Sequence, residues 1–437
     1  MAFSETLYKR LTNEEDARLC DDIPESACRE APQSFALLLA SYLLTKLGDA
    51  IASPKTTLAW ATTTVGAPAF VLAFLVPIRE SGSLIPQLFI GGIIRQLAVR
   101  KWVWIAGSVG QFMSIAGIGA AVIFLEGARA GWAILILITL FSLARGFCSV
   151  AAKDVLGKTI PKPKRGQLNG WSASLAGLLT VGVGVILMLP FSGQLNESWL
   201  GLLIMGAGLL WLVAAGIYTR IPEVPGETDG GRSVIQALKK LRILATDKPF
   251  RRFVTTRALL MCSALSAPYY VALSQDRIGS PSFLLGAFVA AAGTASLVSA
   301  PFWGRFADAS SKRVMIAAAM VTAGIGVTTF LVDRLHPSLA QTLWFLPVAY
   351  FVLSVAHSGV RVGRKTYVVN LATGNQRTDY VAISNTVIGV LLLVVGAVGS
   401  LAAIIGNSGV IGLLAIMGFT GAAVGASLPE VEHSPAN

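Results

Sequence analysis

The sequence predicts an all-α polytopic membrane protein whose twelve transmembrane helices form two six-helix bundles, related by a pseudo-two-fold axis along the membrane normal. Three observations predict this fold. Of the 437 residues, 54% are hydrophobic and 13% are charged, whereas a soluble domain carries about 25% charged residues. Apolar runs long enough to cross a bilayer recur along the whole chain. Polar and basic residues of the first half recur at one fixed offset in the second half.

Twelve helices follow from the apolar runs and the residues that bound them. In the first half we expect helices near residues 34–53, 66–94, 102–124, 131–156, 167–191 and 198–219. In the second half we expect them near residues 253–275, 282–306, 313–332, 342–369, 378–403 and 407–427. The second helix exceeds the ~30 Å hydrocarbon core at ~1.5 Å per residue, so it should tilt or project from the membrane.

The remaining segments divide the chain into domains. Residues 1–32 form an N-terminal tail, 33–219 the first bundle, 220–252 a linker, 253–428 the second bundle and 429–437 a C-terminal tail. Within the linker, residues 232–245 have one apolar and one basic helical face, which favours a helix lying along the inner membrane surface. A plain solvated connector is the alternative.

The distribution of positive charge predicts the orientation. The net charge is +12, and 23 of the 35 Lys and Arg residues fall in the segments assigned to the side of the termini, which are residues 95–101, 153–165, 220–252, 305–313 and 361–377. Four fall in the loops of the other side: Lys55, Arg129, Arg277 and Arg334. This asymmetry predicts that both termini lie in the cytoplasm. We therefore attribute the net positive charge to orientation in the lipid bilayer of the inner membrane and not to binding of nucleic acid. We expect a monomer.

No cofactor or metal site is predicted. Cys20 and Cys28 lie in the tail without a neighbouring histidine, and Cys148 and Cys262 lie in helices, so we expect neither a disulfide nor a zinc site. A membrane enzyme is disfavoured because the sequence lacks an HExxH motif and a phosphate-binding glycine loop.

Two decamers 212 residues apart mark the repeat. The second-half copy holds Gly304, Asp308, Lys312 and Arg313, and the first-half copy holds Gly92, Gln96, Arg100 and Lys101. Glycine allows close backbone approach, a carboxylate suits a helix N-terminus, and basic residues stay on the cytoplasmic side. The same offset relates Arg145 to His357, Lys153 to Lys365, and Arg165 to Arg377. Parallel halves imply a substrate pathway at the seam between them.

In these decamers the chain resembles the major facilitator superfamily of secondary transporters, whose signature loop reads G-x-x-x-D-R-x-G-R-R/K. The second copy keeps the glycine, the acid and the basic pair, while Gln96 replaces the acid in the first. The resemblance spans roughly residues 33–428 and implies a transporter that binds a small-molecule substrate between two bundles. It does not extend to the Gly-Pro motif of the drug/proton antiporters, which is absent from residues 171–189.

Ionisable residues inside the predicted helices are the candidate pathway residues, because a charge at bilayer depth costs about 2.5–3.5 kcal/mol unless it faces a cavity or a partner. They are Lys46, Asp49, Arg79, Glu80, Arg145, His357 and Arg361. Two polar residues join them: Gln87, on the same helical face as Glu80, and Tyr270, on a neutral polar stripe of the seventh helix. Alternatives stay open for four of these residues. Lys46 and Asp49 could form a structural ion pair, His357 could be a packed histidine, and Arg361 could be a basic residue of the cytoplasmic side.

The balance of these charges favours an anionic or zwitterionic substrate. Lys46, Arg79 and Arg145 outnumber Asp49 and Glu80, and a low dielectric amplifies an unpaired charge. We expect a small organic acid, with a proton as candidate coupling ion carried by Asp49 or Glu80. The alternatives are a flippase or exporter of lipids or lipophilic compounds, and a receptor or assembly protein without transport activity.

The decamers also predict a gate on the cytoplasmic side. Asp308 should meet the helix N-terminus near Arg165 when the site faces outward, whereas Gln96 can only form a hydrogen bond near Arg377. The two halves would therefore be latched unequally.

Overall fold

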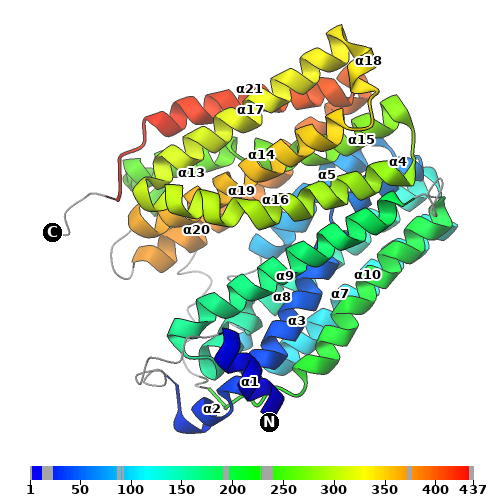
Figure 1. Cartoon of the computed structure of the whole chain (residues 1–437). Helices are drawn as coiled ribbons and strands as arrows, with labels where there is room; N and C mark the ends of the chain where they lie inside the picture. Colours follow the sequence, from blue (N-terminus) through cyan, green and yellow to red (C-terminus); the bar gives the residue numbers. More distant parts are fainter. Residues whose placement is uncertain are drawn as a thin grey trace.

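The computed structural model of the protein describes residues 2–11, 23–85, 90, 93–189, 196–226, 228, 240–371 and 376–432. These residues form α-helices with short 3-10 turns, and none of them lies in a β-strand. The fold is the expected set of twelve spans in two bundles, drawn in Figure 1.

Six spans form the first bundle. They are α3 (Ala31–Ile51), α5 (Ala69–Leu84), α7 (Lys101–Phe124), α8 (Gly127–Thr159), α9 (Lys162–Met188) and α10 (Glu197–Tyr218). A short helix, α4 (Thr57–Thr64), precedes α5. The bounds lie within five residues of the sequence-based expectations except in α5, whose described part ends ten residues early; residues 86–89, 91 and 92 lie outside the described part of the chain.

The second bundle repeats this order with one broken span. Its seventh span consists of α13 (Lys248–Leu259), α14 (Cys262–Leu265) and α15 (Ala267–Ile278). Pro268 lies in the first turn of α15, and proline cannot donate the backbone hydrogen bond that would continue the preceding helix. The other spans are α16 (Ser282–Ala309), α17 (Ser311–Leu335), α19 (Phe345–Leu371), α20 (Gln376–Gly396) and α21 (Ala402–Ala426), with α18 (Pro337–Ala340) before α19.

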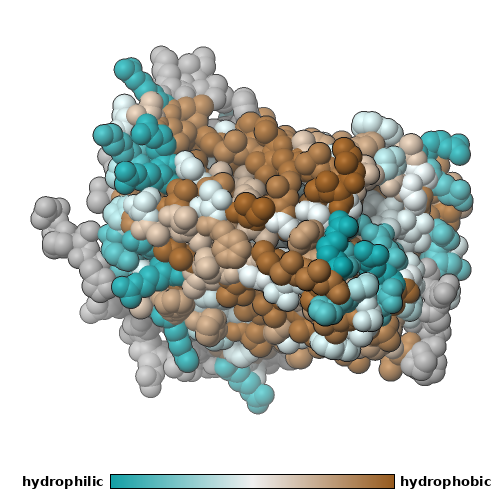
Figure 2. All heavy atoms as spheres, turned by 90° about the horizontal axis from the view of Figure 1, so that it is seen from above, coloured by the Kyte–Doolittle hydropathy of each residue, from teal (hydrophilic) through white to brown (hydrophobic). Residues whose placement is uncertain are grey.

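Length and apolarity alone identify nine candidate spans among the described residues. The last of them, Asp379–Ala426, covers most of α20 and all of α21, so the nine account for ten helices. The other two are α5, which has 16 described residues, and the interrupted α13–α15. Figure 2 shows hydrophobic residues over the middle of one face, with hydrophilic residues gathered toward its ends. Side chains such as Ile404 (81% exposed) suit contact with lipid.

The N-terminal tail is partly helical. It contains α1 (Ala2–Leu11) and α2 (Glu25–Arg29), and Tyr8 packs edge-on against Phe35 of α3 with ring centroids 5.4 Å apart. Cys28 is disulfide-bonded, so the expectation of no disulfide is wrong. Most of the predicted interfacial linker helix lies outside the described residues, which resume with η2 (Lys240–Arg242) and α12 (Ile243–Thr246).

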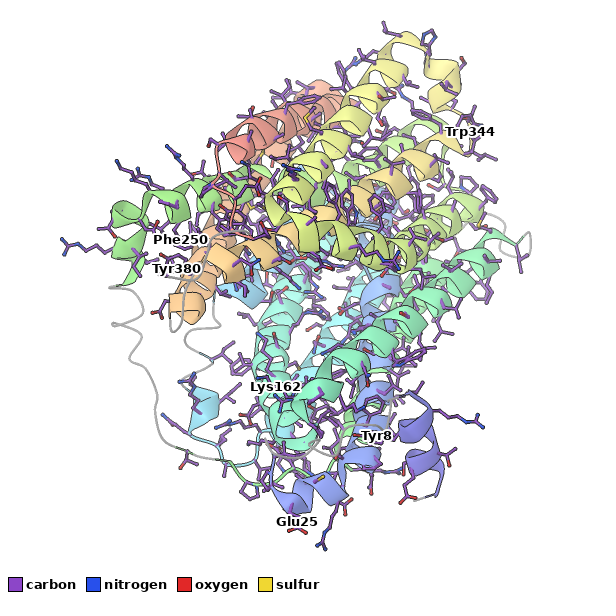
Figure 3. All side chains as sticks on the ribbon, turned by 60° about the vertical axis from the view of Figure 1, so that its left-hand side comes forward. Tyr8, Glu25, Lys162, Phe250, Trp344 and Tyr380 are labelled. Atoms are coloured by element: carbon purple, nitrogen blue, oxygen red, sulfur yellow. The ribbon has the colours of Figure 1, made fainter. Side chains whose placement is uncertain are left out.

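The helices have a terminal end, nearest the two chain termini, and an opposite, distal end. At the terminal end of the second bundle Phe250 and Tyr380 point toward one another (Figure 3), with ring centroids 4.2 Å apart. At the distal end Gln275 of α15 donates to the Trp60 carbonyl (3.4 Å) and to Thr64 Oγ1 (3.2 Å) in α4. These hydrogen bonds join the two bundles at the distal end.

Two seams of small residues bring the bundles together along their length. In the first, α9 lies beside α16 (Figure 1), and a Cβ at Gly184 would be 2.5 Å from the Ala290 nitrogen. In the second, α5 meets α20, and a Cβ at Gly396 would be 2.3 Å from Pro77 Cγ. Glycine at these positions permits a backbone separation that any side chain would prevent.

Candidate functional site

The main cavity lies between the bundles and has a volume of ≈ 450 Å³. Its wall combines α3, α5, α8 and α9 of the first bundle with α16 and α19 of the second. Its charged lining residues are Lys46, Asp49, Lys55, Arg79, Glu80, Arg145 and Arg361. Six of these seven, all except Lys55, were predicted from the sequence. Together the seven comprise five cations and two carboxylates.

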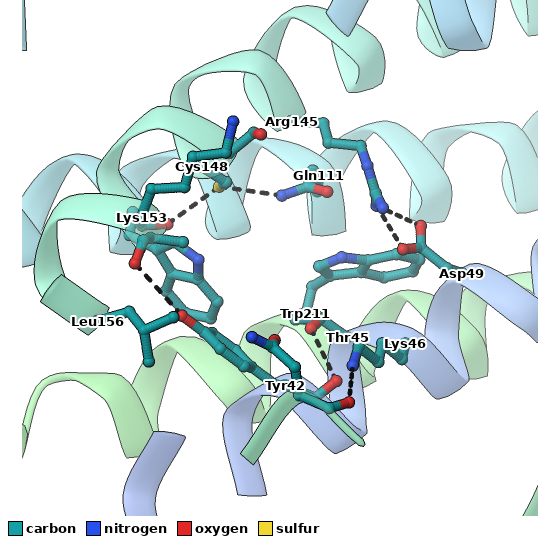
Figure 4. A pocket seen from close by; sticks show the side chains of 14 residues that line it. Tyr42, Thr45, Lys46, Asp49, Gln111, Arg145, Cys148, Lys153, Leu156 and Trp211 are labelled. Atoms are coloured by element: carbon teal, nitrogen blue, oxygen red, sulfur yellow. Dashed lines mark hydrogen bonds and ion pairs between the residues drawn. The ribbon is translucent and has the colours of Figure 1, made fainter. Parts of the chain in front are cut away.

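A second cavity of ≈ 370 Å³ adjoins the first and shares Lys46, Asp49 and Arg145 with it (Figure 4). Its other lining residues include Lys153 and Leu156, which lie in the last two turns of α8. Because α8 ends at the terminal end, the two cavities together extend from the middle of the bundles toward that end.

Asp49 is held by two arginines. Arg145 Nη1 lies within hydrogen-bond distance of both carboxylate oxygens, and Arg79 Nη2 is 2.8 Å from Oδ1. Arg79 also stacks over the Phe141 ring at 4.6 Å. The side chains of Arg79, Asp49 and Arg145 are 11%, 21% and 34% exposed. This cluster carries one excess positive charge at the cavity wall.

Lys46 takes no part in an ion pair with Asp49 within this cluster. Its ammonium donates to the Asn169 carbonyl (3.0 Å) and to Ser172 Oγ (2.5 Å), both on α9. The structural pair considered from the sequence is therefore not formed, because Asp49 turns toward α5 and α8 while Lys46 points to α9. The charge of Lys46 remains available to the cavity.

A third cavity, a lobe of ≈ 180 Å³, continues the main one into the second bundle. Lys55 Nζ lies 3.0 Å from His357 Nε2, and Ser263 Oγ lies 3.0 Å from His357 Nδ1. Arg361 belongs to both this lobe and the main cavity. His357 is thus hydrogen-bonded at a cavity wall, and Arg361 lines the site.

Lys55 is the residue that the sequence analysis missed. The sequence assigned Lys55 to a loop of the outer side, but its side chain lines the lobe and contacts His357 of the other bundle. The chain turns back after Pro54, where Leu58 N donates to the Ser53 carbonyl (2.9 Å), and this turn directs Lys55 inward. Its position just after the predicted helix that carries Lys46 and Asp49 was the available signal.

The remaining pathway residues differ in their placement. Glu80 lines the main cavity, where Lys55 and Arg79 act on it electrostatically. Tyr270 is fully buried in the apolar core and lines none of the three cavities. Gln87 and Gly92 lie outside the described residues, as does the side chain of Arg377.

In the first half, the decamer binds a carboxylate that the sequence did not reveal. Glu223, just after α10, accepts from the backbone nitrogens of Arg100 (2.9 Å) and Lys101 (2.7 Å) at the start of α7. The Arg100 guanidinium pairs with Asp154 of α8, and Lys158 lies 3.1 Å from Glu223. A carboxylate is favourable at a helix N-terminus.

The second half repeats this arrangement. Glu432, after α21, accepts from the backbone nitrogen of Ser311 at the start of α17 (3.0 Å). Glu430 lies 3.9 Å from both Lys312 and Arg313. In each half, therefore, an acid following the last span caps the third span, which links the ends of each bundle.

The predicted contact between Asp308 and Arg165 is not formed among the described side chains. Arg165 instead donates to the carbonyls of Ile160 (2.8 Å) and Gly157 (2.9 Å) in its own bundle. A Cβ at Gly304 would meet nothing within 4 Å, so the close approach expected there is absent. The contacts at the terminal end thus match a conformation in which this end is open, whereas the latch was predicted for the opposite conformation.

Comparisons with known proteins place this geometry in context. A family model described as Major Facilitator Superfamily matches residues 271–437. A multidrug resistance protein MdtG of Escherichia fergusonii is 28% identical over 268 residues, which cover 59% of this chain and 61% of that protein. MdtG of Enterobacter lignolyticus is also 28% identical, over 253 residues that cover 55% of this chain and 56% of that protein. The chain spans about three fifths of the length of these relatives.

Solved structures extend the likeness over nearly the whole chain. A D-xylose-proton symporter superposes with a TM-score of 0.70 at 15% identity, covering 93% of this chain and 100% of the symporter. A bacterial homologue of the iron transporter ferroportin in an inward-facing state gives 0.63 at 18% identity, covering 91% and 98%. At these identities the likeness concerns the fold alone.

Proposed function

Since the chain belongs to the major facilitator superfamily of membrane transporters, we propose that it moves a small anionic or zwitterionic organic solute by alternating access. The substrate binds in the main cavity, between the bundles. Transport is secondary active, with a proton as the coupling ion. The protein works as a monomer in the inner membrane, with the terminal end in the cytoplasm, as the excess of Lys and Arg at that end favours.

The charge of the main cavity carries this proposal. Its lining holds five cations and two carboxylates, and Asp49 is already neutralised by Arg79 and Arg145. Two unit charges 4 Å apart interact by about 4 kcal/mol at an effective dielectric constant of 20. An anionic group therefore gains much more here than a cation, which would meet net repulsion.

The change between the two access states would take place at the contacts between the bundles. Hydrogen bonds between α4 and α15 close the distal end, while the cavities extend toward the terminal end. Rocking the bundles about the glycine contacts of α9 with α16 would open the distal end and bring Asp308 toward Arg165. The substrate shifts the populations of the two states only through its differential affinity for them.

The test is flux into proteoliposomes that contain the purified protein. A panel of labelled organic anions is offered with and without an inward proton gradient, next to protein-free liposomes. We expect saturable uptake of at least one anion, increased by the gradient. A folded protein that carries none of them would contradict the proposal and favour a receptor or assembly role.

A second candidate is export of lipophilic compounds, the alternative raised from the sequence; the relatives' printed name, multidrug resistance protein, is compatible with it. It predicts transport of a lipophilic cation by the same proteoliposomes. The five cations of the main cavity oppose such a substrate. Transport of the cation without transport of any anion would therefore reverse the order of the two candidates.

A further inference from the structure

The side chains of Lys55, His357 and Ser263 form a hydrogen-bonded chain across the seam. Lys55 comes from the turn between α3 and α4 of the first bundle, whereas His357 lies on α19 and Ser263 on α14 of the second. Both distances to the imidazole are 3.0 Å. This chain is a direct polar contact between the bundles at the wall of the lobe.

The donors and acceptors determine the protonation of the imidazole. An ammonium can only donate, so His357 Nε2 must accept from Lys55. Ser263 donates its hydroxyl proton to the Leu260 carbonyl (3.0 Å), so its oxygen accepts from His357 Nδ1–H. The imidazole in this chain is therefore neutral, with its proton on Nδ1.

Protonation of His357 is incompatible with the Lys55 contact. The imidazolium has no acceptor at Nε2, and it would place a second positive charge 3.0 Å from the Lys55 ammonium. Both groups would then be donors directed into the lobe. Such a pair is stable only when an anion accepts from both of them.

Among the residues that the structure describes around the lobe, none provides that anion. Arg361 and Arg364 of α19 and Lys55 act on His357 with positive charge. The neighbouring carboxylate is Glu80 of α5, which Lys55, Arg79, Arg364 and Arg145 already share. The faces contributed by α14, α15 and α16 are neutral: Ser263, Ala267, Ala292, Ala295 and Ser296. The other polar lining groups, which include Ser354, Ser358 and Tyr350, are hydroxyls that can donate to an oxyanion.

We propose that this lobe is a carboxylate site that fills together with a proton: His357 takes up the proton, releases Lys55, and both then donate to the carboxylate. The proposal rests on the proposed function only in assigning that carboxylate to the transported solute. The proton comes from hydronium in the solvent: one of its O–H bonds breaks, leaving water, as the Nε2–H bond of His357 forms. Coupling is reciprocal, because a proton that increases anion affinity implies an anion that increases proton affinity by the same factor.

The test follows His357 itself. The rate of hydrogen exchange at imidazole C2, measured by mass spectrometry against pH, gives the titration midpoint of each histidine in the detergent-purified full chain. Acetate, succinate and benzoate are added in turn at an ionic strength held constant with sodium chloride. His336, which is exposed beyond α17, is the internal control.

We expect at least one of the three acids to move the His357 midpoint by about one unit to higher pH, which corresponds to tenfold tighter binding to the protonated form. The effect should saturate and should leave His336 unchanged. In Lys55→Met the acid should no longer move the His357 midpoint, whereas Lys55→Arg, which keeps the cation, should retain the shift. A wild-type midpoint that none of the acids moves would overturn the proposal without any variant, as would an undiminished shift in a folded Lys55→Met protein.

This outcome is separate from the flux assay. If the acid shifts the His357 midpoint but the protein transports no organic anion, the carboxylate site is supported and the proposed function is contradicted. If the protein transports an organic anion but no acid shifts the midpoint, the proposed function is supported and the carboxylate site is contradicted.

Discussion

The arginine pair around Asp49 allows a quantitative test of the cavity. Changing Arg145 to Gln removes the cation that contacts both carboxylate oxygens, but it leaves Arg79 Nη2 2.8 Å from Asp49. The cluster then holds one cation and one anion. Changing Asp49 to Asn instead leaves Arg79 and Arg145 facing each other without their shared counter-charge.

The two changes should therefore differ in cost. Breaking a buried pair so that a charge is left uncompensated costs about 3–5 kcal/mol, and this applies to Asp49→Asn. Arg145→Gln should cost about 1–3 kcal/mol, because Arg79 still compensates the carboxylate and because Arg145 is 34% exposed and partly screened. In the Asp49→Asn/Arg145→Gln double variant, the loss in free energy of unfolding should be smaller than the sum of the two single losses by about 1–3 kcal/mol.

Equilibrium unfolding in mixed detergent micelles measures these free energies. Arg129, which is exposed near the start of the same helix, provides the matched control Arg129→Gln, and its free energy of unfolding should equal that of the wild type. In proteoliposomes, Arg145→Gln and Arg145→Ala should abolish anion transport while the protein remains folded.

Two results would refute this reasoning. One is an Arg145→Gln protein as stable as Arg129→Gln, with a coupling energy to Asp49 below about 0.5 kcal/mol. The other is normal anion transport by Arg145→Ala, which would remove Arg145 from the pathway.

Three further predictions concern the seam, the loops and pH. Gly184→Ala should add a steric cost of about 1–3 kcal/mol to the contact of α9 with Ala290, which favours the distal-open state and speeds labelling of a Ser53→Cys reporter from the distal side by about tenfold. The control is Gly182→Ala, whose Cβ meets nothing within 4 Å and which should leave the labelling rate unchanged. Equal labelling rates in the two variants would contradict the role of this seam. Gln96→Asp restores the missing acid of the first decamer and should favour closure of the terminal end, so unchanged accessibility of that reporter from both sides would count against the latch. Burial raises the pKa of Glu432, but hydrogen bonds from Ser311 outweigh this effect and leave the pKa below its ordinary value. The Glu432 cap should therefore stabilise α17 at neutral pH and be lost as the pH falls below about 4.5. Its loss should be measurable as faster hydrogen exchange at the Ser311 amide, which Glu432→Gln should show already at neutral pH.

Much of the fold was predictable because lipid leaves few alternatives. Apolar runs between polar segments must become helices in a bilayer, and the observed α7 (Lys101–Phe124) lies within one residue of its expected bounds. The seventh span shows where this fails. Pro268 in the sequence accounts for the break before α15, but no proline marks the earlier break near Leu260.

The site was predictable as a set of residues but not as a set of partners. Helical spacing places Lys46 and Asp49 on one face, but only the packing of three helices decides that Asp49 meets arginines and Lys46 meets α9. The repeat offset paired Arg145 with His357, and both line the cavities. Tyr270 was predicted as a pathway residue but is buried in the apolar core.

Residues outside the helices were the least predictable. Composition alone makes Lys55 a loop residue, and only the turn after Pro54 carries it into the lobe. Likewise Glu223 and Glu432 are ordinary acids in sequence, and their role depends on the closeness of the ends of two spans.

The central claim is that an excess of cations in the main cavity selects an anionic solute. The most direct measurement compares proteoliposome uptake of the organic acid found in the flux panel with that of its neutral amide analogue, of nearly the same size and shape. The account predicts that the amide is carried at least about tenfold more slowly, since it forgoes the charge interaction. Equal uptake of the acid and the amide would contradict it.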